Sequence, residues 1–232
     1  MVQSLNTKAI LTMASVLRRP SLMVPHVTVP TVSDLNYEAL KKQDIVDAIV
    51  FDKDNTLTAP YENKVHPQAS CGLEMARCVF GNDRVAILSN SVGSSDDIGY
   101  RDAKRVEDDL GIAVIRHQEK KPGGLHEVLH HFSLSDATRI CVVGDRILTD
   151  IVFGNLHGMF TVHTQKPLQL RRDHWTARMI RPVENVILYG RGGRRSWLFR
   201  KNIPDHVYWT EKDPSKLILL AGGGDVTQDK KK

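Results

Sequence analysis

Short apolar runs alternate with amphipathic segments of helical length along most of the chain after Asp47. The apolar runs are rich in β-branched side chains and show no alternation between apolar and polar residues. Strands that are buried on both faces of a parallel sheet have this pattern. We therefore expect five strands, at residues 48–51, 85–88, 113–115, 140–143 and 159–162.

Helical segments separate these runs. The clearest one has Pro67 in its first turn and ends before Gly81, which is the usual placement of proline and glycine around a helix. We expect helices at residues 67–80, 95–110, 123–132 and 150–157. This alternation predicts an α/β fold, a doubly wound parallel sheet of about five strands with a Rossmann-like core. Ligands bind such sheets at the carboxyl ends of the strands.

Polar residues suited to phosphoryl chemistry lie beyond these strand ends. In chain order they are Asp52, Asp54, Ser89, Asn90, Lys121, Asp145 and Asp150. Each is common singly, but the ordered set at successive strand ends is not expected by chance. Carboxylates that converge on one point repel one another, so the site needs a hard cation such as Mg²⁺. A phosphoryl group can then bind between that cation, a lysine ammonium and a hydroxyl.

This set resembles the motifs of the haloacid dehalogenase superfamily of phosphotransferases, from about Asp47 to His163. The resemblance implies that Asp52 attacks phosphorus and forms an aspartyl-phosphate. Asp54 then serves as the acid for the leaving alkoxide and as the base for the hydrolytic water. It also implies that Ser89 binds a phosphoryl oxygen and that Lys121 neutralises charge.

The same resemblance implies the metal ligands. They are the carboxylate of Asp52, the backbone carbonyl of Asp54 and the carboxylate of Asp145, with Asp150 outside them, orienting metal-bound water or Lys121. Ion-pumping relatives carry threonine in place of Asp54 and keep their phosphoaspartate, so a carboxylate here favours a phosphatase.

Two neighbouring assignments remain open. Asn90 could share the role of Ser89, and Lys120 could replace Lys121. We favour Ser89 because it ends the strand, and Lys121 because it precedes proline. Alternation along an extended strand exit predicts that Lys53 points away from the site.

The connections between the motifs are too short for a cap domain. Residues 58–85 hold little more than one helix, and residues 91–121 hold one helix and one strand. The resemblance is therefore to the capless members, subfamily III A. An open site suits phosphates on large substrates, such as lipid head groups, proteins or nucleic-acid ends, although neighbours in a homo-oligomer could serve as lids.

The net charge of the chain predicts an anionic partner. The chain has 232 residues, enough for one α/β domain with attached arms, and a formal charge of +5. Its three cysteines show no metal-binding spacing, and Cys141 lies in an apolar run, so we expect a buried free thiol and a reducing compartment.

Residues 1–34 form a predicted basic N-terminal arm. The first 33 residues contain no Asp or Glu, and Lys8, Arg18 and Arg19 are their basic residues. The pattern is typical of a transit peptide and equally of an interfacial membrane helix, while an ordinary docked helix is the alternative. We expect removal of residues 1–33 to weaken liposome binding and leave hydrolysis near normal.

Residues 190–232 form a predicted basic C-terminal extension with a disordered tail, after a phosphatase domain at residues 35–189. Nine basic residues lie between Arg171 and Lys201, with Trp175 and Trp197 among them. This favours contact with an anionic bilayer, and the alternative is a solvated helix face with the tryptophans in the core. The predicted membrane-binding residues are Lys8, Arg18, Arg19, Arg191, Arg194, Arg195 and Trp197.

A closer resemblance is to the mitochondrial phosphatidylglycerophosphate phosphatases of fungi and algae. The strings that carry it are 50–58, 60–61, 88–91, 121–122 and 143–150. It implies hydrolysis of an anionic phospholipid in cardiolipin synthesis, by a peripheral enzyme on the matrix side of the mitochondrial inner membrane. No nucleic-acid partner is expected. The runner-up function is an open-site phosphatase for polynucleotide ends or another phosphorylated macromolecule, and a non-catalytic scaffold is a third reading.

Overall fold

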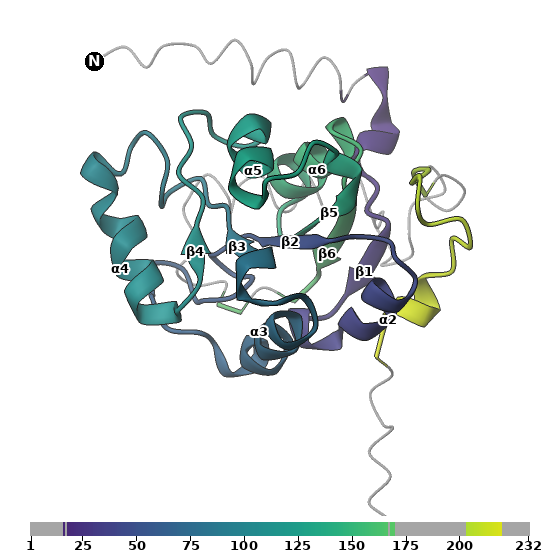
Figure 1. The fold of residues 1–232 in the computed structure, drawn as a ribbon, viewed down its shortest axis with the longest axis horizontal. Helices are drawn as coiled ribbons and strands as arrows, with labels where there is room; N and C mark the ends of the chain where they lie inside the picture. The colour runs from purple at the N-terminus through teal and green to yellow at the C-terminus, as the bar shows by residue number, and fades with distance from the viewer. Residues whose placement is uncertain (1–15, 17, 167, 170–202, 220–232) are drawn as a thin grey trace, which may run out of the picture.

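A six-stranded, all-parallel sheet forms the centre of the molecule (Figure 1). The computed structural model describes residues 16, 18–166, 168–169 and 203–219. The strands are β1 (Val27–Val29), β2 (Ala48–Phe51), β3 (Val85–Ile87), β4 (Ala113–Val114), β5 (Ile140–Gly144) and β6 (Phe160–Thr164). Their order across the sheet is β1-β6-β5-β2-β3-β4, which places β2 and β5 side by side near the middle.

Helices cover both faces of this sheet. The α-helices among the described residues are α2 (Tyr37–Lys42), α3 (Pro67–Phe80), α4 (Arg101–Leu110), α5 (Leu125–Phe132) and α6 (Val152–Leu156). A π-helical turn, η6 (Ile147–Ile151), leads directly into α6. Figure 1 shows α2 and α3 on one side of the sheet and α5 and α6 on the other.

The strands divide their side chains between two cores. In β2, Ile49 and Phe51 pack with α2, α3 and α4, whereas Ala48 and Val50 pack with α5 and α6. Successive side chains of a strand point to opposite faces, so both faces need apolar residues when both are covered. This explains why the apolar runs show no alternation, and it confirms the predicted fold class.

Side-chain contacts explain why one helix begins later than predicted. Helix α3 spans the predicted residues, but the predicted helix at 95–110 begins later, at Arg101. The carboxylate of Asp97 accepts hydrogen bonds from the backbone N–H groups of Asp102 (3.0 Å) and Ala103 (2.8 Å). It therefore satisfies donors of the first turn and fixes the start of α4.

The first domain boundary, predicted at residue 34, is wrong. Strand β1 lies at 27–29 and pairs in parallel with β6, with Val27 opposite Val162. Strand β1 has only three residues, so its apolar pattern is too short to be recognised within the acid-free N-terminal stretch. The sheet therefore has six strands where about five were expected.

Residues before β1 are also packed against the domain. Val16, Met23 and Val24 contact the apolar side chains of η6 and α6. The side-chain amide of Asn155 donates to the backbone carbonyls of Leu22 and Val24, each at 2.8 Å. Removing residues 1–33 would delete this packing together with β1, so near-normal hydrolysis after that truncation is not compatible with the fold. Residues 1–15 lie outside the described part.

Part of the predicted C-terminal extension belongs to the domain as well. Ile218 bridges Leu35, and the backbone N–H of Asn36 donates to the carbonyl of Leu217 at 2.9 Å. Trp209 is 1% exposed and lies in the main core. Figure 1 shows this segment in yellow, beside β1 and α2. The predicted tail at 220–232 lies outside the described residues.

A buried aromatic cluster joins the two terminal segments. His26 stacks on Phe160 and contacts the rings of His206 and Trp209 edge-on. The backbone N–H of Thr161 donates to Nδ1 of His26 at 3.0 Å, so this nitrogen carries a lone pair and the ring is neutral. Burial, with the nearby His206 adding to it, lowers the pKa of His26 to about 3.

This neutral histidine predicts a loss of stability in acid. The unfolded chain takes up a proton at His26 near pH 6.5, whereas the folded chain does not until about pH 3. The stabilisation is complete above pH 6.5 and falls as the pH drops toward 3. Between pH 7 and pH 5 the free energy of unfolding should fall by about 2 kcal/mol on this account. Urea denaturation of the wild type and of His26→Gln at both pH values measures it.

The substituted chain should lose about 2 kcal/mol less between the two pH values than the wild type. His126→Gln is the matched control, because His126 is exposed on α5. An equal pH dependence in the wild type and in His26→Gln would contradict the prediction.

Candidate active site at the carboxyl ends of β2 and β5

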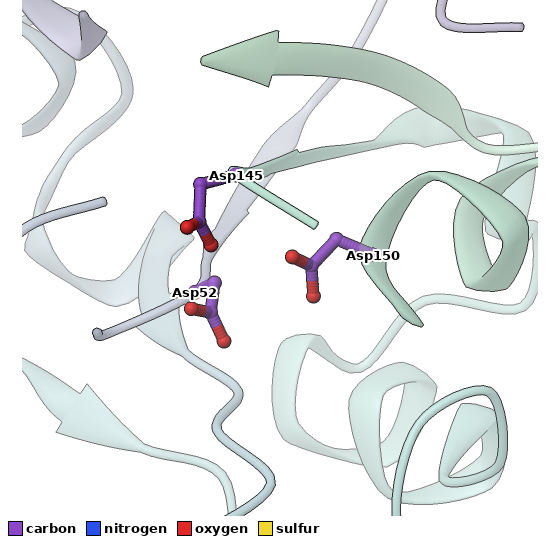
Figure 2. A group of neighbouring side chains, drawn as sticks. All are labelled: Asp52, Asp145 and Asp150. Carbon is purple, nitrogen blue, oxygen red and sulfur yellow. The ribbon is translucent and has the colours of Figure 1, made fainter. Parts of the chain in front are cut away.

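Three aspartates meet where β2 and β5 end (Figure 2). Phe51 is opposite Val143 in these neighbouring strands, and the backbone N–H of Asp52 donates to the carbonyl of Val143 at 2.8 Å. Because parallel strands in this register end together, Asp52 and Asp145 leave the sheet at the same place. Asp150 reaches them from the η6 turn. Each offers a carboxylate oxygen, and these oxygens all lie within 4.8 Å of one another.

Lys121 lies between two of these carboxylates. Its Nζ atom donates to Oδ1 of Asp52 at 2.6 Å and to Oδ1 of Asp150 at 2.5 Å. Burial alone would lower the pKa of Lys121, but Asp150 and Asp52 outweigh it and raise that pKa to about 12. Lys121 therefore stays charged at neutral pH.

Burial has the opposite consequence for Asp52. It raises the pKa of this carboxyl group to about 6, Asp150 adds to the rise, and Lys121 opposes it. One ammonium does not balance three carboxylates, and a further cation would favour their ionised forms. Hard divalent cations prefer oxygen ligands, so the donor set of Asp52, Asp145 and Asp150 fits such an ion.

The loop after β3 contacts this group through the backbone of Lys121. Asn90 accepts a hydrogen bond from the backbone N–H of Lys121 at 2.7 Å, so it fixes the loop that carries this lysine. Ser89 is buried, and its Oγ lies 3.0 Å from Oγ of Ser91. Lys120 is exposed and pairs with Asp96, which excludes it as an alternative to Lys121.

Asp54 lies beside the three carboxylates, 31% exposed in its side chain. Its Oδ1 accepts a hydrogen bond from Nζ of Lys53 at 2.9 Å, and its Oδ2 accepts one from Oγ of Ser91 at 3.3 Å. Lys53 therefore turns toward Asp54, and the prediction that it points away from the site is wrong. The chain turns sharply after Asp52, so strand alternation does not extend to it.

The structure thus brings together the predicted Asp52, Asp145, Asp150 and Lys121. Asp150 lies closer than predicted, since its carboxylate belongs to the possible ligand group itself. Metal binding by the Asp54 carbonyl stays a prediction. Ser91 is a contact that the sequence analysis missed, and the signal available was its place two residues after Ser89. The predicted membrane-binding residues Lys8, Arg191, Arg194, Arg195 and Trp197 lie outside the described residues, whereas Arg18 and Arg19 are exposed.

Comparison with known proteins identifies the family of this chain. The family model described as mitochondrial PGP phosphatase matches residues 7–169, which is more than half of the chain. This chain belongs to the mitochondrial PGP phosphatase family. The match includes β1 and every residue of the carboxylate group.

Curated relatives carry related names. The chain is 38% identical over 189 residues to phosphatidylglycerophosphate phosphatase 1, chloroplastic/mitochondrial, of Arabidopsis thaliana, covering 80% of this chain and 53% of the relative. It is 37% identical over 162 residues to the mitochondrial phosphatidylglycerophosphatase of Saccharomyces cerevisiae, covering 68% and 86%. The chloroplastic phosphatidylglycerophosphate phosphatase 1 of Chlamydomonas reinhardtii is 41% identical over 166 residues, covering 71% and 60%. The matches therefore span only about half to two thirds of the plant and algal proteins.

In this member of the PGP phosphatase family, two structural facts bear on access to the site. Between β2 and Lys121 the structure describes every residue and contains α3, β3, α4 and β4 with their connecting loops, without an inserted domain. Within the described residues, no helix combines the length and the apolar character needed to cross a membrane.

Gly144 makes room for Asp150. A Cβ atom at Gly144 would lie 2.3 Å from Oδ2 and 2.4 Å from Cγ of Asp150. The same Oδ2 accepts a hydrogen bond from the backbone N–H of Arg146 at 3.1 Å, which holds the carboxylate over the glycine. The missing side chain therefore lets Asp150 reach Lys121.

Gly144→Ala should displace the Asp150 carboxylate and lower phosphate-ester turnover by roughly 10²-fold, as small misplacements of catalytic groups do. The measurement is turnover of p-nitrophenyl phosphate per folded molecule, with the folded fraction taken from circular dichroism. Gly154→Ala is the steric control, since its Cβ would meet a methyl carbon of Thr161 at 2.3 Å. If both variants lose stability but keep wild-type turnover, the role given to Gly144 is wrong.

Proposed function

We propose that this chain hydrolyses the terminal phosphate of phosphatidylglycerophosphate and releases phosphatidylglycerol. One observation carries the proposal. In a member of the mitochondrial PGP phosphatase family, the Asp52 carboxylate lies in a buried group with Lys121, Asp145 and Asp150. Relatives named phosphatidylglycerophosphatase support the substrate.

The proposed chemistry has two steps. An oxygen of Asp52 attacks phosphorus, the ester P–O bond breaks, and Asp54 gives a proton to the leaving alkoxide. Water then attacks phosphorus, returns a proton to Asp54, and frees Asp52 as a carboxylate with inorganic phosphate. Lys121 neutralises charge on Asp52 and the phosphoryl group, and Ser89 donates a hydrogen bond to a phosphoryl oxygen.

Mg²⁺ is the proposed cofactor. The carboxylates of Asp52, Asp145 and Asp150 would hold it, and the backbone carbonyl of Asp54 is a further proposed ligand. When bound, the cation neutralises negative charge on the phosphoryl oxygens.

We further propose peripheral association with anionic phospholipid at the mitochondrial inner membrane, on the matrix side. Relatives are named mitochondrial, and the absence of a cap between β2 and Lys121 suits a head group presented at a surface. Arg18 and Arg19 are exposed on the packed N-terminal segment, where they could contact anionic lipid. The carboxylate group itself comes from one chain, so a homo-oligomer is not needed to complete it.

The substrate proposal is tested by phosphate release from short-chain phosphatidylglycerophosphate. We expect turnover with Mg²⁺ and none after chelation with EDTA. Asp52→Asn should lower turnover by roughly 10⁴-fold or more, because it removes the nucleophile, while circular dichroism shows an intact fold. Turnover of an oligonucleotide 3′-phosphate without turnover of the lipid would overturn the substrate proposal, and retained activity in Asp52→Asn would overturn the mechanism.

Membrane contact is tested by flotation with liposomes rich in phosphatidylglycerol. Each basic residue near such a surface contributes about 1 kcal/mol, so Arg18→Gln with Arg19→Gln should weaken binding about 30-fold at low salt. Lys41→Gln with Lys42→Gln is the matched control, since these two lysines are exposed on α2. Equal losses in the two double variants would argue against a lipid contact at Arg18 and Arg19.

A further inference from the structure

Lys53 is a buried lysine with a single carboxylate contact among the described residues. Its side chain is 2% exposed, and its Nζ lies 2.9 Å from Oδ1 of Asp54. Moving an ammonium group out of water costs several kcal/mol unless it is paired. A methionine or leucine of similar volume would fill the same space without that cost. Packing alone therefore does not explain why a charged residue occupies position 53.

The backbone at Lys53 explains how its side chain comes to face Asp54. The carbonyl of Lys53 accepts hydrogen bonds from the backbone N–H groups of Leu57 and Thr58, both at 3.0 Å. The chain therefore turns back on itself immediately after β2. The side chain of Lys53 is buried, so its ammonium group faces Asp54 and not solvent.

The two oxygens of the Asp54 carboxylate face chemically different partners. Oδ1 faces Lys53, whose ammonium group can only donate hydrogen bonds. Oδ2 faces the hydroxyl of Ser91, which can donate or accept. A protonated carboxyl group at Asp54 can therefore carry its hydrogen on Oδ2 but not on Oδ1, where it would meet the hydrogens of Lys53.

Oδ2 is also the oxygen linked to the phosphate-binding side of the site. Oγ of Ser91 lies 3.3 Å from Oδ2 of Asp54 and 3.0 Å from Oγ of Ser89. Ser89 is the residue proposed to hold a phosphoryl oxygen. The oxygen that can carry the proton is thus connected through one hydroxyl to the place where the ester would bind.

We propose that Lys53 is a positioning residue, which holds Oδ1 of Asp54 and so assigns the transferred proton to Oδ2. This rests on the proposed phosphatase function. In the first step Asp52 forms its bond to phosphorus, the ester P–O bond breaks, and the leaving oxygen takes the proton from Oδ2 of Asp54. In the second step the oxygen of a water molecule forms a bond to phosphorus, the bond between phosphorus and Asp52 breaks, and a proton of that water returns to Oδ2.

Leaving groups that differ in their need for a proton test this role. The alkoxide of short-chain phosphatidylglycerophosphate needs protonation as it departs, whereas p-nitrophenolate is stable as an anion near neutral pH. The first turnover is followed by rapid mixing, so that product formation reports phosphoryl transfer to Asp52 alone. For Lys53→Met the first-turnover rate should fall about 10²-fold with the lipid and by less than about threefold with p-nitrophenyl phosphate.

Two further variants make the result specific. Lys53→Gln keeps an N–H donor toward Oδ1, so it should recover a large part of the rate lost with the lipid. If Lys53→Met does not fold, Lys53→Leu replaces it, because it also removes the donor to Oδ1. Lys120→Met removes an exposed lysine that also pairs with an aspartate, Asp96, and should leave the ratio of the two rates unchanged.

The outcomes separate this inference from the function on which it rests. If the wild type hydrolyses neither ester, the phosphatase function fails. If the wild type hydrolyses both and Lys53→Met slows them equally, or slows neither, Lys53 does not position the proton of Asp54. A Lys53→Gln variant as slow with the lipid as Lys53→Met would also overturn the role.

Discussion

The positive charge of Lys121 offsets the repulsion among the buried carboxylates of Asp52, Asp145 and Asp150. It bonds to Asp52 and Asp150, and no other described lysine or arginine is shown to pair with these two residues. Asp52 nevertheless has a pKa raised to about 6, because burial outweighs the attraction to Lys121. The neighbouring structure holds this arrangement in place, since Asn90 fixes the backbone of Lys121 and Gly144 admits Asp150. A divalent cation is the natural complement to the charge that remains.

Much of this site follows from the sequence because it depends on strand ends. Aspartates that follow buried strands of a parallel sheet must meet at one edge, whichever order the strands take across it. That reasoning, together with the family resemblance, predicts Asp52, Asp145 and Lys121 from the sequence. It did not foresee the contact of Lys53 with Asp54, because the alternation rule requires an extended chain. The hydrogen bonds to the Lys53 carbonyl show that the chain turns there instead.

The terminal segments were harder to predict for a different reason. Composition describes a segment as a whole, and an acid-free, basic stretch suggests a separate arm. Packing depends on a few residues within it, such as the three of β1 or the single Trp209. His26 and Trp209 come from opposite ends of the chain and meet around Phe160, so both ends complete the domain. No local pattern contains that information, since it requires the positions of both partners.

The N-terminal segment also links exposed basic residues to the buried carboxylate group. Val16, Met23 and Val24 pack against the side chains of the η6 turn and α6, and that turn carries Asp150. Asp150 in turn accepts a hydrogen bond from Lys121, which also donates to Asp52, the proposed nucleophile. Arg18 and Arg19, the proposed lipid contacts, lie on this same segment. A membrane that binds these arginines would therefore contact the segment that packs against the η6 turn, and this turn positions Asp150. Attachment to the membrane and the geometry of the carboxylate group would then depend on the same N-terminal segment.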